Sequence, residues 1–137
     1  MKIVLISCVK EKAAGRHRAK DLYVSSWFRY AFRYSQVLHP DRVFILSAKY
    51  GLVDQDSEIE SYEETLRDKS KPEKQAWARR VLTDLSRQAD LQRDRFVILA
   101  GDGYRKYLVP DLGNYEVPMQ GLRIGEQMRW LKEACSP

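Results

Sequence analysis

Apolar residues form short runs that alternate along the chain with segments of helical periodicity. The runs at residues 2–7, 42–47 and 95–100 are continuous, aliphatic and of strand length, which is typical of parallel strands buried on both faces. A weaker run at residues 115–118 predicts a fourth strand. Each run is followed by a helical pattern and not by a hairpin turn, so the sequence predicts one parallel sheet with right-handed crossovers.

Apolar spacing and end signals predict the helices between these strands. We expect helices at residues 25–38, 70–89 and 124–135, with a short helical segment before Pro110. The second of these opens with Ser70-Lys71-Pro72-Glu73, in which serine, proline and glutamate occupy the positions that they prefer in a first helical turn.

This order of elements predicts one α/β domain over residues 1–137. The expected fold is a three-layer α/β/α arrangement with a mainly parallel four-stranded sheet, of Rossmann-like type. A chain of 137 residues can bury one core and has little room for a second. Its content of 44% hydrophobic and 31% charged residues is that of a folded soluble protein and argues against disorder.

Composition also excludes several classes of protein. The longest apolar runs are far too short to cross a bilayer, so we expect no membrane association. The first residues lead directly into a predicted strand, so we expect no signal peptide. Its two cysteines, Cys8 and Cys135, have neither metal-ligand spacing nor a disulfide framework. The sequence therefore predicts a cytoplasmic protein with no metal and no cofactor.

Charge is unevenly distributed around the formal net charge of +5. Residues 1–20 hold six basic residues and one acidic residue, whereas residues 51–70 hold seven acidic and two basic residues. The segment 8–20 has no apolar period and is predicted to be a long, mobile loop. Such a basic loop suggests a polyanionic partner such as nucleic acid. It could equally serve solubility, or pair in cis with the acidic residues at 54–64.

Polar and aromatic residues gather directly after the strands. Ligands of an open parallel sheet bind beyond the carboxyl ends of its strands, where these loops converge. The candidate binding residues there are Ser7, Cys8 and Lys10 after the first strand, Ser47, Lys49, Tyr50 and Gly51 after the second, Gly101 and Tyr104 after the third, and Gly121 after the fourth. Turn formation alone would explain the glycines and serines, but it explains the lysines and tyrosines less well.

Six phrases at and between these loops carry a resemblance to known proteins. They are Ile6-Ser7-Cys8-x-Lys10-x-Lys12, Leu22-Tyr23-x-Ser25, Leu46-Ser47-Ala48-Lys49-Tyr50-Gly51-Leu52, Ile59-Glu60-x-Tyr62-Glu63-x-Thr65-Leu66, Ala100-Gly101-x-x-Tyr104 and Pro118-x-x-Gly121-Leu122-x-Ile124-Gly125-Glu126-Gln127. Over nearly its whole length the chain resembles a family of short bacterial and phage proteins of unknown function. It is more distantly similar to the peroxide-stress YaaA proteins, without their helical insertions.

The resemblance implies action on nucleobases. YaaA proteins bind DNA and have been likened to DNA glycosylases, and a related domain occurs in archaeal enzymes that modify a deazaguanine base in tRNA. We therefore expect a nucleic-acid partner, DNA rather than RNA, and a glycosylase-like hydrolase that excises a modified or damaged base. Two alternatives stay open: a non-catalytic DNA-binding module of stress response, and a hydrolase or transferase that acts on free nucleosides or nucleotides.

Residue types and the resemblance together suggest roles in a pocket for a flipped base. Such a pocket needs aromatic faces, groups that read the base edge, cations for the phosphates and a carboxylate near the sugar. The candidates are Tyr50, Tyr62 and Tyr104 for stacking, Tyr23 and Gln127 for other contacts with the base, Lys12, Arg16, Arg18 and Lys20 for the nucleic-acid backbone, and Glu60, Glu63, Lys10 and Lys49 for catalysis.

Two routes to cleavage of the N-glycosidic bond follow from these residues. Glu60 or Glu63 could stabilise an oxocarbenium-like sugar or activate water. A lysine could instead attack C1′ and form a Schiff base, if burial favours its neutral amine. The sequence favours water attack, because Lys10 lies in a charged loop where a hydrated ammonium group is a poor nucleophile.

Overall fold

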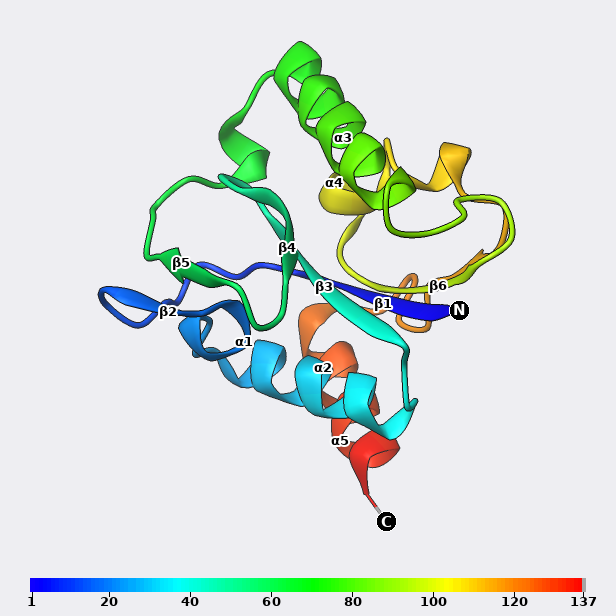
Figure 1. The fold of residues 1–137 in the computed structure, drawn as a ribbon. Helices are drawn as coiled ribbons and strands as arrows, with labels where there is room; N and C mark the ends of the chain where they lie inside the picture. The colour runs from blue at the N-terminus through cyan, green and yellow to red at the C-terminus, as the bar shows by residue number, and fades with distance from the viewer. Residues whose placement is uncertain (137) are drawn as a thin grey trace.

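The predicted apolar runs form the centre of a five-stranded sheet in the computed structural model, which describes residues 1–136 (Figure 1). The strand order is β4-β3-β1-β6-β7. Four of these strands, β1 (Lys2–Ser7), β3 (Arg42–Ser47), β6 (Arg95–Leu99) and β7 (Tyr115–Glu116), pair in parallel with their neighbours. The predicted position and direction of the four strands are confirmed, and the last strand is shorter than expected.

The central strand β1 is covered along both edges and both faces. Leu5 pairs with Phe44 of β3 on one side and with Ile98 of β6 on the other. Residues 3–6 have no exposed surface. Complete burial of a leucine or isoleucine side chain contributes about 1.5–3 kcal/mol, so this strand accounts for a large part of the core.

The edge strand β4 (Gly51–Asp54) is the element of the sheet that the sequence did not predict. It runs antiparallel to β3, with Gly51 opposite Ser47 and Asp54 opposite Phe44. Gly51 has a φ of +75°, a left-handed conformation that glycine adopts without steric cost. The sheet therefore has five strands and not four, because the chain turns back at residues 48–50 and the returning segment is too short to show a period.

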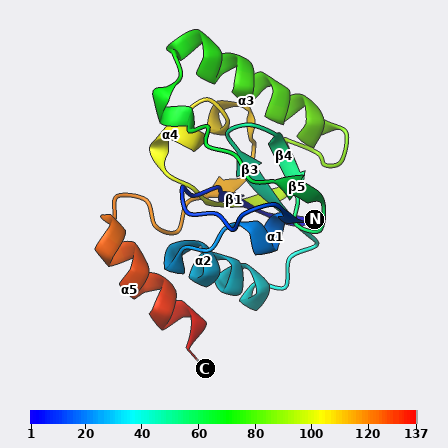
Figure 2. The same cartoon turned by 90° about the vertical axis from the view of Figure 1, so that its left-hand side faces the viewer.

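The helices lie on opposite sides of the sheet in Figures 1 and 2. On one side α2 (Ser26–Val37) packs against α5 (Ile124–Cys135), and on the other lie α3 (Lys71–Ser86) and the short α4 (Asp102–Arg105). The predicted helices are confirmed, although α3 ends before the predicted boundary. No helix within residues 1–136 is long and apolar enough to span a membrane.

The first turns of α2 and α3 are fixed by side-chain caps that the sequence predicts. Ser25 Oγ accepts a hydrogen bond from the N–H of Phe28 at 3.1 Å. At the start of α3, Ser70 Oγ accepts from the N–H of Glu73 at 3.3 Å, and the Glu73 carboxylate accepts from the N–H of Ser70 at 3.0 Å. Such reciprocal caps contribute about 1 kcal/mol each and set where the preceding loop ends.

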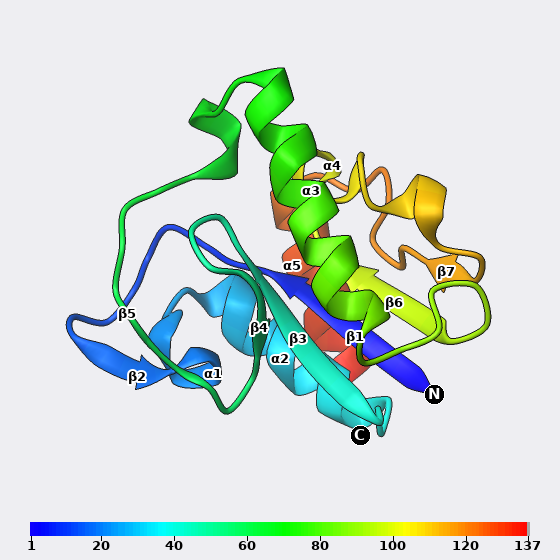
Figure 3. The same cartoon turned by 45° about the horizontal axis from the view of Figure 1, so that its top comes forward.

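The basic segment that the sequence predicts as a mobile loop is ordered by the acidic segment. Within it, β2 (Arg16–Arg18) pairs antiparallel with β5 (Glu58–Glu60), and α1 (Ala19–Leu22) follows directly. Figure 3 shows the two strands side by side, apart from the main sheet. The backbone N–H groups of Ala19 and Lys20 donate to the carbonyls of Ser57 and Gln55 at 2.8 and 3.0 Å.

Opposite charges face each other across this two-stranded sheet. Arg16 is paired with Glu60 and Arg18 with Glu58, and Lys20 forms an ion pair with Asp56 at 3.1 Å. The prediction of a free basic arm at residues 16–20 is therefore wrong, and the cis pairing that the sequence left open describes the molecule. Three-residue strands whose partners lie about forty residues away carry no local period, so their pairing could not be read from the sequence.

Replacing Ile59 by alanine should loosen this pairing. Ile59 is 7% exposed and is the buried residue at the centre of β5, so Ile59→Ala should lower the free energy of unfolding by about 2–4 kcal/mol. Ile124→Ala is the matched control, because Ile124 is 65% exposed and its loss should cost less than about 0.5 kcal/mol. Urea denaturation measures both, and equal midpoints for the two variants would contradict the role given to β5.

Candidate functional site

A cavity of about 680 Å³ opens at the carboxyl edge of the parallel strands. Its walls come from the loop after β1, from the segment between β5 and α3, and from α4. The lining residues are Cys8, Val9, Lys10, Lys12, Tyr62, Glu63, Glu64, Thr65, Arg67, Asp68 and Tyr104. Its volume lies in the range of small-molecule sites, and its position is the one expected for a ligand of an open parallel sheet.

Cys8 and Tyr104 form one wall of the cavity. The backbone N–H of Cys8 donates to the carbonyl of Leu46 at 3.0 Å, which continues the β1–β3 pairing by one residue. The Cys8 thiol and the Tyr104 hydroxyl share a hydrogen bond of 3.1 Å, and the Tyr104 ring packs edge-on against Trp77 with 5.6 Å between ring centres. Burial raises the pKa of the Tyr104 phenol, so its hydroxyl stays protonated and can donate a hydrogen bond.

A network of buried hydroxyl groups supports the part of the wall that Tyr62 forms. Ser47 Oγ donates to the Tyr62 hydroxyl at 2.8 Å, and the hydroxyls of Tyr62 and Tyr23 are 2.6 Å apart. The N–H of Tyr50 donates to the same Ser47 oxygen at 2.9 Å. Burial raises the pKa of both Tyr23 and Tyr62. These two phenols are therefore neutral hydrogen-bonding groups that hold the wall in place.

Lys12 reaches across the face of this wall. Its ammonium lies 4.4 Å from the centre of the Tyr62 ring and 5.8 Å from that of Tyr23, which are cation–π distances. It also donates to the carbonyl of Lys10 at 3.3 Å. Partial burial lowers the pKa of Lys12, and the nearby Cys8, Glu11 and Glu63 oppose that shift in part.

The acidic residues of the cavity come from the segment after β5. Glu64 is paired with Lys69 at 3.2 Å. Glu63 forms no ion pair within residues 1–136, which leaves its carboxylate available to a ligand. No group of three or more His, Cys, Asp or Glu residues in that same range is placed to hold a metal ion.

The structure brings six of the nineteen residues that the sequence singled out to the cavity. Those that line the cavity are Cys8, Lys10, Lys12, Tyr62, Glu63 and Tyr104. Ser47, Tyr23 and Tyr50 lie behind its wall, where the Tyr50 ring packs edge-on against Tyr62 at 5.6 Å between ring centres. Ser7 ends β1 and is 7% exposed, and Gly51 opens β4. None of these five residues lines the cavity.

The remaining predicted residues lie elsewhere. Glu60 is on β5 opposite Arg16, and Lys49 lines a separate hollow of about 350 Å³ beside α3. Gly101, Gly121 and Gln127 line another of about 210 Å³, where the Gln127 side chain accepts from Trp27 Nε1 at 2.9 Å and donates to the Leu122 carbonyl. The sequence placed all four strand-end loops at one rim of the sheet, but the loops after the second and fourth strands do not line this cavity. The first and third loops meet, and the segment at residues 62–68 completes the cavity.

The sequence missed five lining residues: Val9, Glu64, Thr65, Arg67 and Asp68. The last two belong to a short 3-10 helix at residues 66–68, which follows a segment without regular structure. The only signal for them was their place beside the Tyr62-Glu63 phrase. Their arrival at the cavity depends on the β2–β5 pairing, which no local pattern predicted.

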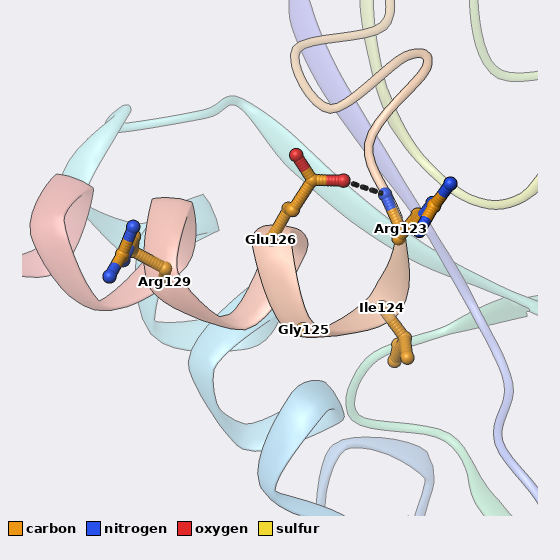
Figure 4. Close-up of a pocket in the computed structure, with 5 residues that line it drawn as sticks. All are labelled: Arg123, Ile124, Gly125, Glu126 and Arg129. Carbon is orange, nitrogen blue, oxygen red and sulfur yellow. Dashed lines mark hydrogen bonds between the residues drawn. The ribbon is translucent and has the colours of Figure 1, made fainter.

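A larger hollow, of about 800 Å³, lies against the first turn of α5 and is shown in Figure 4. The Glu126 carboxylate there accepts from the N–H of Arg123 at 3.0 Å, so it caps the helix that carries it. Arg123 and Arg129 extend away from each other, on opposite sides of that turn. This hollow is the surface around a capped helix end, and the cavity at the strand ends is the better candidate site.

Comparison with known proteins identifies a family for the chain. Residues 3–133 match the model of DUF6884, a family of unknown function, and the chain belongs to that family. Neither the curated proteins nor the solved structures provide a match. The family description carries no activity, so the function must be argued from the cavity.

The buried phenols should make stability fall steeply in alkali. A phenol whose pKa is raised in the folded state stabilises the fold below the pKa of the unfolded chain, about 10, and this contribution is lost as the pH rises above that value. Tyr62→Phe removes one such group. Its free energy of unfolding should therefore decline less steeply above pH 10, by up to about 1.4 kcal/mol per pH unit.

Urea denaturation at a series of alkaline pH values measures this slope. Tyr115→Phe is the control, because Tyr115 is 45% exposed and should leave the slope unchanged. Slopes for Tyr62→Phe that equal those of the unmodified protein would show that the Tyr62 phenol ionises in the folded state as freely as in the unfolded chain.

Proposed function

We propose that this member of DUF6884 binds a nucleotide unit in the 680 Å³ cavity and cleaves its N-glycosidic bond, as a DNA glycosylase-like hydrolase. One observation carries the proposal. Two tyrosines, two lysines and an unpaired carboxylate, from Tyr62, Tyr104, Lys10, Lys12 and Glu63, line a single cavity at the carboxyl edge of the sheet. These are the groups that recognition of a base, a phosphate and a sugar requires.

The Tyr104 ring suits a planar base. Tyr104 is partly exposed to the cavity, whereas the Tyr62 ring is buried beneath the Lys12 ammonium. Stacking of a base on an aromatic ring contributes about 1–3 kcal/mol. The Tyr104 hydroxyl is held by its hydrogen bond with Cys8, so little conformational entropy is lost when a base binds.

Cations at the cavity suit the phosphates on either side of the sugar. Lys10 and Arg67 are both exposed and both line the opening. An exposed ammonium or guanidinium group binds a phosphate through charge-assisted hydrogen bonds, and each such contact releases counterions from a nucleic acid. We therefore propose these two residues as the contacts with the nucleic-acid backbone. The basic segment at 16–20 no longer has this role, because its charges lie opposite acidic residues.

Glu63 supplies the charge that the reaction needs. Cleavage of an N-glycosidic bond passes through a sugar with oxocarbenium character, and a carboxylate beside C1′ stabilises that positive charge. The carboxylate stabilises the transition state more than the neutral ground state, so it contributes to rate and little to affinity. Glu60, the other predicted carboxylate, faces Arg16 outside the cavity and has no part in this proposal.

The choice of DNA rests on the resemblance to the YaaA proteins. The finer description of the fold as a three-layer, Rossmann-like and YaaA-like α/β/α arrangement belongs to the same proposal, as does a cytoplasmic location in which Cys8 and Cys135 stay reduced. A second candidate substrate is a free nucleoside or nucleotide. It is favoured by the pairing of β2 with β5, because that pairing removes the long basic surface that a duplex would contact.

Glu63→Gln is the central test of the proposed reaction. A panel of duplex oligonucleotides, each with one modified or damaged base, and a matching panel of free nucleosides are incubated with the protein. Released base is measured by mass spectrometry, and abasic sites by alkaline cleavage. The unmodified protein should release one base, and Glu63→Gln should reduce that rate at least about 100-fold while it keeps the affinity. Glu60→Gln should react within about twofold of the unmodified protein.

Other outcomes of this experiment separate the candidates. Release from free nucleosides but not from DNA would replace the glycosylase with the small-molecule hydrolase. Binding of modified DNA without any released base would replace both with a non-catalytic DNA-binding module. An equal loss in the rate of base release for Glu60→Gln and Glu63→Gln would show that the reaction does not take place in the cavity.

Salt dependence of DNA binding tests which cations contact the backbone. Lys10→Ala should lower the slope of log affinity against log salt by about 1, because one phosphate contact is lost. The triple variant Arg16→Ala, Arg18→Ala, Lys20→Ala should leave the slope unchanged, because the residues opposite them are Glu60, Glu58 and Asp56. Fluorescence anisotropy over a range of salt concentrations measures both, and a lower slope for the triple variant would restore the basic segment as a DNA contact.

A further inference from the structure

Lys12 is held in the cavity by its backbone. It forms an isolated antiparallel bridge with Tyr23, and hydrogen bonds flank that bridge on both sides. The N–H of Ala13 donates to the carbonyl of Leu22 at 2.8 Å, and the N–H of Val24 donates to the carbonyl of Glu11 at 3.0 Å. The part of the loop that carries Lys12 is therefore fixed to the segment between α1 and α2, and is not the mobile chain that the sequence suggested.

The Lys12 side chain is fixed as well. Its ammonium rests on the Tyr62 ring at 4.4 Å, and that ring is itself held by the Ser47 and Tyr23 hydroxyls. Lys12 is half-buried, whereas Lys10, two residues earlier, is exposed. A lysine side chain has several rotatable bonds, and its conformational freedom is lost only where its surroundings define its position. The structure therefore presents the Lys12 amine to the cavity in a defined place.

We infer that Lys12 is the nucleophile of the proposed cleavage, and that its side-chain amine attacks C1′ of the sugar and forms a Schiff base. This inference rests on the proposed function and names the group that replaces water as the attacking species. Glu63, which lines the same cavity, keeps its role of stabilising positive charge on the sugar.

Burial shifts Lys12 toward the neutral amine that this chemistry needs, while its cation–π contacts with Tyr62 and Tyr23 favour the charged form. Partial burial lowers the pKa of Lys12, which increases the fraction of nucleophilic amine at a given pH. The titratable groups around it are Cys8 at the end of β1, Glu11 on its own loop, Tyr23, and Tyr62 and Glu63 after β5. The two tyrosines are neutral, and Cys8, Glu11 and Glu63 limit the shift without reversing it.

The proposed reaction needs no reactant other than the substrate, the Lys12 amine and water. The amine lone pair forms a bond to C1′ as the C1′–N bond breaks, and the bonding electrons leave with the base, which takes a proton from solvent. The attached nitrogen loses a proton, the C1′–O4′ bond opens, and O4′ takes up a proton, which leaves a protonated imine between C1′ and Lys12. Addition of water returns the amine and a proton and leaves the sugar as an aldehyde, so the net reaction is hydrolysis.

Reductive trapping tests this inference directly. The full chain is incubated with a duplex oligonucleotide that contains one preformed abasic site, whose aldehyde forms an imine with a reactive amine, and cyanoborohydride reduces the imine to a stable adduct. Peptide mapping should place the adduct on Lys12, with a yield that levels off below the usual lysine pKa as the pH rises. An adduct on Lys10, or one spread over the surface lysines, would overturn the inference.

Variants extend the test to the reaction itself. Lys12→Arg keeps the positive charge but cannot form the imine, so trapping and base release from the oligonucleotide panel should each fall more than about tenfold. Lys20→Arg is the control, since Lys20 lies outside the cavity in an ion pair with Asp56, and should retain both. Mapping of the unmodified protein remains decisive if Lys12→Arg fails to fold.

The two proposals fail in different ways. Base release that persists in a folded Lys12→Arg variant would overturn Lys12 as nucleophile and leave the proposed function intact, with water as the attacking group. A panel from which the unmodified protein releases no base would overturn the proposed function, and the assignment of Lys12 as its nucleophile with it.

Discussion

The candidate site depends on one buried hydroxyl group. The Tyr62 hydroxyl accepts a hydrogen bond from Ser47 at the end of β3 and lies 2.6 Å from that of Tyr23, which precedes α2. Tyr62 thereby joins three parts of the chain that are distant in sequence. A buried phenol that lost these partners would pay the cost of desolvation, about 1–3 kcal/mol, so the network favours one arrangement of the wall. The position of Lys12 over the Tyr62 ring follows from it.

Charge pairing within the chain changes which partners the protein suits. The sequence has a formal net charge of +5, and its basic N-terminal segment predicted an extended contact surface for nucleic acid. In the folded chain that segment lies against the acidic strand β5, so local charge is close to balanced there. Positive groups remain at the rim of the cavity, in Lys10 and Arg67. The proposed partner is therefore a nucleotide unit at the cavity, and the basic segment is not proposed as a contact surface for a duplex.

Elements with their own period or end signal were predictable, and elements defined by a distant partner were not. The strands β1, β3 and β6 are continuous apolar runs. The start of α3 is marked by the capping residues Ser70 and Glu73. The strands β2 and β5 show no such signal, because three residues cannot establish a pattern. Of the site, the sequence identified six residues through their types and phrases: Cys8, Lys10, Lys12, Tyr62, Glu63 and Tyr104. It also included Glu60, Lys49 and Gln127, which lie outside the cavity.

By itself, then, the amino-acid sequence determined the parallel strands, their directions and the edge of the sheet at which the candidate site lies. Burial of apolar side chains is a local property of each run, and the carboxyl ends of parallel strands must share an edge. Only the tertiary structure decided which loops meet at that edge. The antiparallel pairing of β2 with β5 brings residues 62–68 to the cavity that Cys8 and Tyr104 also line. That pairing is a contact between segments about forty residues apart, and no local pattern encodes it.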